Sequence, residues 1–106
     1  MIREIREEEK KLIAHIVKDE IEIPKFIREL KDGGMGSISF DLNKKSIRYE
    51  SLFNAEFIDS DGLLVDIELT IDEQGNLFEF DFFKVDFNKL INYPKYENLT
   101  ITKCNI

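Results

Sequence analysis

The sequence contains few of the residues from which metal sites and covalent cross-links are built. Its 106 residues include one cysteine, Cys104, and one histidine, His15. A single cysteine excludes an internal disulfide, and one cysteine with one histidine excludes the clusters of these residues that hold structural zinc. We therefore expect no metal, no cofactor and no disulfide framework.

Long apolar runs are also missing. No stretch reaches the roughly 18–20 consecutive apolar residues of a membrane-spanning helix, and residues 1–11 are charged where a signal peptide has its apolar centre. With 42% hydrophobic and 35% charged residues, the composition is typical of a globular protein, and the length suits one domain. The sequence thus predicts a cytoplasmic protein that folds as a single domain over residues 1–106.

Catalytic motifs are equally scarce. The glycine-rich segment 32–37 lacks the Gly-Lys-Ser/Thr ending of a phosphate-binding loop, and its place between a predicted helix and a predicted strand indicates a helix end. Segment 59–62 (DSDG) begins like a calcium loop, but the apolar residues 63–65 follow it, which favours a hairpin turn. No nucleophile, base and orienting acid can be grouped from the sequence. We expect a protein that is not an enzyme.

The first 31 residues carry a helical pattern. Apolar residues recur at three- and four-residue spacing and predict an amphipathic helix over residues 4–18: Ile5, Leu12, Ile13, Ile16 and Val17. Pro24 suits the first position of a second, short helix, in which Phe26, Ile27 and Leu30 would share one side. The glycines at 33 and 34 would end it.

From residue 37 the period changes to two, which predicts strands over 37–42, 47–57, 63–71 and 77–87 and leaves open a fifth at 99–101. A β-bulge at Phe82-Phe83 would keep the phenylalanines of 78–87 on one side. The predicted fold class is α+β. Two N-terminal helices (1–31) would pack on one face of a four- to five-stranded antiparallel meander (32–106).

The net charge of −7 arises entirely from residues 32–106, where fourteen acidic residues face seven basic ones. Strand alternation would place eight acids on the face opposite the phenylalanines, together with Arg48 and Lys84: Asp41, Glu50, Glu56, Asp66, Glu68, Glu79, Asp81 and Asp86. Neighbouring like charges destabilise a sheet, and acidic surfaces repel nucleic acid and anionic membranes. The pattern predicts either a solubilising surface or a binding face for a basic protein.

Several fragments together resemble a family of small, stand-alone bacterial domains of unknown function. They are REIREEEKKLI near the N-terminus, DGGMGSI (32–38), EFIDSDGLLVDIELTID (56–72), GNLFEFDFFKVDF (75–87) and LINYP (90–94). The resemblance covers nearly the whole chain and implies no catalytic motif. The protein is also similar in kind to the immunity proteins of contact-dependent inhibition and other polymorphic toxin systems. That likeness implies a cytoplasmic protein whose eight acids bind a basic, nuclease-like toxin domain.

A second hypothesis is a small-molecule-binding or enzymatic domain. Its pocket would lie between the helices and the phenylalanine-rich sheet, with Tyr49, Asp32 and His15 as polar groups. The sequence does not determine the oligomeric state or the identity of a partner.

Overall fold

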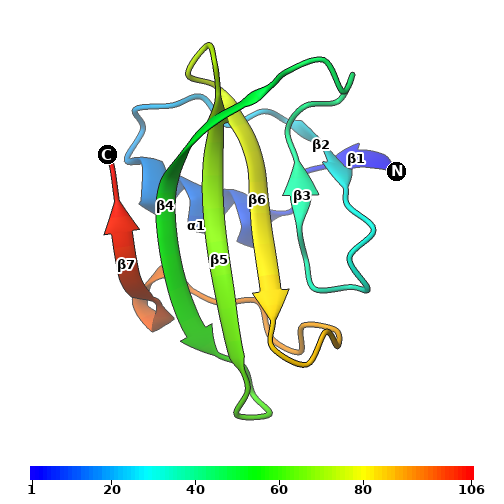
Figure 1. The fold of residues 1–106 in the computed structure, drawn as a ribbon, viewed down its shortest axis with the longest axis vertical. Coiled ribbons are helices and arrows are strands. Elements are labelled where there is room, and N and C mark those ends of the chain that lie inside the picture. The colour runs from blue at the N-terminus through cyan, green and yellow to red at the C-terminus, as the bar shows by residue number, and fades with distance from the viewer.

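One antiparallel sheet of seven strands forms most of the molecule in the computed structural model, which describes all 106 residues. The elements follow the chain as β1 (Ile2–Glu4), α1 (Glu7–Val17), β2 (Phe26–Glu29), β3 (Ile38–Ser39), β4 (Arg48–Ile58), β5 (Leu64–Asp72), β6 (Leu77–Lys84), the 3₁₀ turn η1 (Tyr96–Asn98) and β7 (Thr100–Cys104). The strand order is β1-β2-β3-β6-β5-β4-β7. In Figure 1, α1 lies behind β4, β5 and β6, and no helix lies in front of them.

The helix predicted over residues 4–18 forms from Glu7 to Val17. Its apolar stripe, which includes Leu12 and Ile16, is buried against the sheet. Three glutamates in the first turn suit the positive end of the helix dipole, and Lys18 ends the helix in a left-handed conformation (φ 52°). No helix in the structure is long and apolar enough to cross a membrane.

The predicted architecture of two helices on a four- to five-stranded meander is wrong. The segment predicted as a second helix contains β2, which pairs with β1 on one side and β3 on the other, so that residues 1–31 are not a helical part. Spacing alone could not separate the two structures, because a short apolar run such as Phe26-Ile27 fits either period. The protein is therefore mostly β, with one α-helix.

The meander β4-β5-β6 supplies the centre of the core. Phe53, Ile67 and Phe80 point towards α1 and are buried, and Phe82 packs edge-on against Phe80, with ring centroids 5.0 Å apart. The predicted edge segment also pairs, because β7 lies antiparallel to β4. The sheet therefore has seven strands and not four or five.

β3 joins the two halves of the sheet although it is only two residues long. Ser37, just before it, accepts a hydrogen bond at Oγ from the backbone N–H of Phe82 (2.9 Å) and donates one to the Phe82 carbonyl (3.3 Å). Side-chain hydrogen bonds thus extend a backbone pairing that would otherwise end.

A second set of contacts holds the N-terminal strands to α1. The Arg3 guanidinium donates two hydrogen bonds of 2.9 Å to the buried carboxylate of Glu9 and forms an ion pair with Glu29 of β2 (3.2 Å). Glu9 also accepts the backbone N–H of Arg6 at the start of the helix (2.8 Å). Hydrogen bonding to Glu9 raises the pKa of Arg3, so this cation stays charged.

The predicted bulge at Phe82-Phe83 is wrong, because the alternation of β6 continues without interruption to Lys84. Phe83 points outward, and Lys84 points inward with 1% of its surface exposed. Its Nζ donates hydrogen bonds to Asp59 (2.9 Å), to Asp61 (2.6 Å) and to the carbonyl of Lys89 (3.2 Å). Two carboxylates thus compensate for the burial of an ammonium group.

Asp59 connects this ion pair to the loop that follows β6. Its carboxylate also accepts the backbone N–H groups of Ile91 (2.8 Å), Asn92 (3.0 Å) and Ser60 (2.8 Å). Burial acts to raise the pKa of Asp59, but these hydrogen bonds and Lys84 outweigh it and lower the pKa to about 2. Hydrogen bonding to Asp61 raises the pKa of Lys84. Lys84 and Asp59 are therefore both charged at neutral pH.

We expect Asp59→Ala to lower the free energy of unfolding by about 3–5 kcal/mol, because it leaves the buried Lys84 ammonium with one carboxylate and removes the acceptor of two N–H groups of the loop after β6. Urea unfolding measures the loss, and hydrogen exchange should show faster exchange at Ile91 and Asn92. Asp61→Ala is the matched control. Its loss should be smaller, since Asp61 is partly exposed and accepts only the backbone N–H of Leu63 in its own turn, none from the loop after β6. Equal losses for the two variants would contradict this assignment.

The lowered pKa of Asp59 also sets a pH window. An aspartate in the unfolded chain has a pKa near 3.9, whereas Asp59 in the folded protein has a pKa of about 2. The contribution of Asp59 to stability is therefore fully present above about pH 4 and is lost as the pH falls through about 2. Urea unfolding between pH 2 and 5 should show a steeper fall for wild type than for Asp59→Ala, and parallel curves would contradict the lowered pKa.

Candidate protein-binding face

The side of the sheet opposite α1, here called the outer face, is turned towards the viewer in Figure 1. Its residues alternate with the core residues of the three central strands. They are Asn54, Glu56 and Ile58 of β4, Leu64, Asp66 and Glu68 of β5, and Glu79, Asp81 and Phe83 of β6. No helix lies over this side of the three strands; Ile58, Asp66 and Phe83 are exposed and the other six residues are partly exposed.

Five acids of the outer face form one acidic patch: Glu56, Asp66, Glu68, Glu79 and Asp81. Glu56 lies directly opposite Asp66, and Glu68 lies directly opposite Asp81 on the neighbouring strand. Glu79 is two residues from Asp81, on the same side of β6. Directly opposite residues have Cβ atoms about 4.5–5.5 Å apart, so like charges repel here.

Both burial and this crowding act on the pKa of Asp81. Partial burial raises it, and the charges of Glu79, Glu68 and Asp32 raise it further, to about 7. A hydrogen bond with the Glu79 side chain adds to the shift. Near neutral pH the patch therefore retains part of a proton that an isolated aspartate would have lost.

Arg48 is the one basic side chain that forms an ion pair with the patch. Its guanidinium lies 3.3 Å from Glu68 Oε2, and both side chains are substantially exposed. Exposed pairs of this kind contribute roughly 0–1 kcal/mol. The patch is thus left mostly uncompensated within the chain.

The other three acids predicted for this face lie elsewhere. Asp41 accepts the backbone N–H groups of Lys45 and Ser46 in the turn before β4. Asp86 lies beyond β6 and accepts hydrogen bonds from the backbone N–H and the side-chain amide of Asn88. These hydrogen bonds lower the pKa of Asp86.

The register of β4 explains the position of the third acid. The pairing of β4 with β5 shifts in register on either side of Ser51. Glu50 therefore lies opposite Ile71, whose side chain packs against the core, and does not lie opposite a residue of the outer face. Lys84, predicted on the acidic face, is inside the molecule. The observed face therefore has fewer acids and also lacks this cation.

Sequence reasoning missed an apolar group at one end of the outer face. Ile58, Phe83, Val85 and Phe87 are 63%, 45%, 43% and 65% exposed, and Leu64 is partly buried between them. The signal was present, since the uninterrupted alternation from Phe80 to Lys84 places Phe83 outward. The presumed bulge concealed it.

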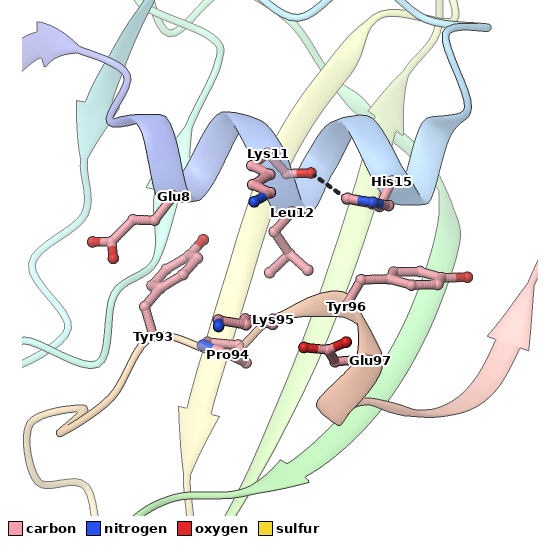
Figure 2. Close-up of a pocket in the computed structure, with 9 residues that line it drawn as sticks. All are labelled: Glu8, Lys11, Leu12, His15, Tyr93, Pro94, Lys95, Tyr96 and Glu97. Carbon is pink, nitrogen blue, oxygen red and sulfur yellow. Dashed lines mark hydrogen bonds between the residues drawn. The ribbon is translucent and has the colours of Figure 1, made fainter.

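A cleft with a volume of about 560 Å³ lies between α1 and the segment 93–97, on the other side of the sheet from the outer face (Figure 2). The His15 ring stacks on Tyr96 with centroids 5.5 Å apart, and its Nδ1 lies 2.9 Å from the Lys11 carbonyl. The Tyr93 hydroxyl is buried without a hydrogen-bond partner. Burial, then the charges of nearby glutamates, raise the pKa of Tyr93.

The polar groups predicted for a ligand pocket do not gather in this cleft. His15 lines it, but Tyr49 is an exposed residue of β4 and is not among the residues that line it. The Asp32 carboxylate instead accepts the backbone N–H groups of Gly34, Met35 and Ser37 and fixes the loop before β3. The structure thus separates the three residues.

Comparison with known proteins gives a family. The family model described as a domain of unknown function (DUF6984) matches residues 2–94, so the chain belongs to this family. The predicted resemblance to a family of unknown function is thereby confirmed. No curated protein and no solved structure matches the chain. The likeness to immunity proteins stays a prediction.

The raised pKa of Asp81 predicts a dependence of stability on pH. Because the folded pKa of about 7 exceeds the unfolded value near 3.9, the folded state binds the extra proton between these limits. The free energy of unfolding should therefore fall as the pH rises from about 4 to 7.

Asp81→Asn should flatten this fall and exceed wild type at pH 8 by up to about 1 kcal/mol. Urea unfolding across the range measures both effects. Asp86→Asn is the matched control, because the pKa of Asp86 is lowered and its titration lies below the window. An Asp81→Asn curve with the wild-type slope would assign the proton to another group.

Proposed function

We propose that this member of the DUF6984 family is a non-catalytic binding protein that holds a basic protein against its acidic patch. The observation that carries the proposal is the patch itself, in which five carboxylates on three adjacent strands have one exposed arginine as counter-ion. Lysine and arginine side chains of a partner would supply the missing charges.

The distribution of charge supports binding over solubility alone. A solubilising surface needs charges of both signs, interspersed over the molecule, and a few charges of net excess. Here the acids are instead concentrated on neighbouring strands, where partial burial and then the charges of Glu79 and Glu68 raise the pKa of Asp81 to about 7. Such an arrangement lowers the stability of the free protein and becomes favourable when a cationic surface covers it.

The partner class we propose is a basic toxin domain, with this chain as its immunity protein. The support is the likeness in kind to immunity proteins and the repulsion between the patch and nucleic acid. A row of carboxylates can occupy the phosphate-binding groove of a nuclease by presenting similar negative charge. Such binding would inhibit a toxin without any catalytic residue in the inhibitor.

A second candidate function, from a different class, is binding of a small molecule in the cleft between α1 and residues 93–97. The Tyr93 hydroxyl favours it, because a buried hydroxyl without a partner has an unused hydrogen bond. The lining is mixed in charge, with Glu8, Glu97, Lys11 and Lys95 around it. It offers no set of groups that selects one ligand chemistry.

Charge reversal tests the main proposal. Asp66→Lys combined with Glu68→Lys should weaken binding to a basic toxin domain encoded beside this protein by about 2–4 kcal/mol, which is roughly 30- to 1,000-fold in Kd. The fold should be retained, since the two side chains lie on the outer face. Titration calorimetry at two salt concentrations measures the affinity and its dependence on charge.

The matched control is Glu20→Lys combined with Glu22→Lys, two exposed acids between α1 and β2. It changes the net charge by the same amount at a distance from the patch and should leave the affinity within a few-fold of wild type. Equal losses for both double variants would mean that net charge alone acts. Absence of binding by wild type would refute the proposed pair.

A further inference from the structure

We infer that the partner anchors an apolar side chain, flanked by basic ones, on the apolar end of the outer face; this rests on the proposed function and names the chemistry of the partner's surface. The apolar end consists of Ile58, Leu64, Phe83, Val85 and Phe87. It adjoins the acidic patch, since Ile58, Leu64 and Phe83 lie on the same three strands and Val85 and Phe87 directly follow β6.

Three of these residues form a row across neighbouring chain segments. Ile58 of β4 lies directly opposite Leu64 of β5, and the Val85 backbone N–H donates to the Leu64 carbonyl (3.1 Å). Phe83 lies opposite Asp66 in the adjacent row. The exposed side chains are therefore one contiguous surface and not scattered apolar residues.

Phe87 provides an independent observation. Its φ is 62°, in the left-handed region, which is unfavourable for a bulky residue and favours glycine or asparagine. Its ring contacts Phe83 at right angles, with centroids 5.1 Å apart, yet most of the side chain remains exposed. An aromatic residue is thus held in a strained turn without being buried, which is typical of positions used for recognition.

The position of the charges selects the occupant. Alternate residues along a strand lie roughly 7 Å apart, so Glu56 and Asp66 lie one row from the Ile58–Leu64 row, and Glu68 and Asp81 lie two rows from it. A helix carrying an apolar residue with lysine or arginine one and two turns away matches this spacing, at roughly 5.4 Å per turn. A second copy of this chain is disfavoured, since two acidic patches would repel each other.

The two parts of the surface should act differently on binding. Aromatic residues in a desolvated contact slow dissociation, whereas exposed charges mainly speed association and make it sensitive to salt. The apolar end can therefore be tested separately from the acidic patch.

The test uses two short helical peptides of equal charge, one of lysine and leucine with the leucines on one face, the other with alanine in place of leucine. Fluorescence anisotropy should show that the leucine peptide binds wild type at least about 10-fold more tightly. Phe83→Ser combined with Phe87→Ser should reduce this affinity to that of the alanine peptide. Phe26→Ser, at an exposed phenylalanine of β2, is the matched control and should change nothing.

Phe87→Asn separates recognition from structure, because asparagine tolerates the left-handed conformation. This variant should bind the leucine peptide more weakly than wild type and should have an equal or higher thermal unfolding midpoint. A lowered midpoint would make Phe87 a structural residue and overturn the inference.

The remaining outcomes distinguish failure of the inference from failure of the proposed function. Equal, salt-sensitive binding of both peptides would overturn the apolar anchor and leave the basic-partner proposal standing. No binding of either peptide, or binding unaffected by Asp66→Lys with Glu68→Lys, would overturn both. Sedimentation that shows a wild-type dimer abolished by the double serine variant would identify a second copy as the occupant and overturn the inference.

Discussion

The ion pair between Lys84 and Asp59 determines both the interior and the surface of this protein. Lys84 must point inward to reach Asp59, so its neighbours Phe83 and Val85 must point outward. The same Asp59 carboxylate holds the loop after β6 through the backbone of Ile91 and Asn92. One buried contact thus fixes the end of the hairpin, the path of the loop and the exposure of an aromatic pair.

The buried and exposed charges of the molecule follow opposite rules. Inside, Arg3 is paired with Glu9, and Lys84 is paired with two aspartates. On the outer face, acids oppose acids, and a single exposed arginine forms an ion pair with one of them, Glu68. Folding would favour a balanced outer face, so this imbalance is the feature that points beyond stability to association.

The sequence predicted the central strands well because their alternation is long and regular, as in residues 63–71. It failed where the pattern is short or where a polar residue is buried. Phe26-Ile27 is too brief to distinguish helix from strand, and Lys84 contradicts the rule that lysine faces solvent. A bulge that keeps Phe82 and Phe83 on one side turns Lys84 outward and Phe83, Val85 and Phe87 inward, which is the reverse of their observed positions.

The candidate site shows the same division. Glu56, Asp66, Glu68, Glu79 and Asp81 share one face as their alternation indicated, since each lies within a regular strand. Asp41, Asp86 and Glu50 lie in turns or beyond a register shift, where period two does not apply. The role of Asp59 required knowledge of a loop 32 residues further along the chain, which no local pattern contains.

The brevity of β3 bears on the order in which the sheet assembles and opens. The β4-β5-β6 meander joins neighbours in sequence, whereas the β3–β6 pairing closes a loop of about forty residues through two positions. We expect the meander to form early in folding and the β1-β2-β3 portion to dock onto it afterwards. In the native state that N-terminal portion would then be a separate unit of partial unfolding, held by the Ser37 hydroxyl and by the packing of α1.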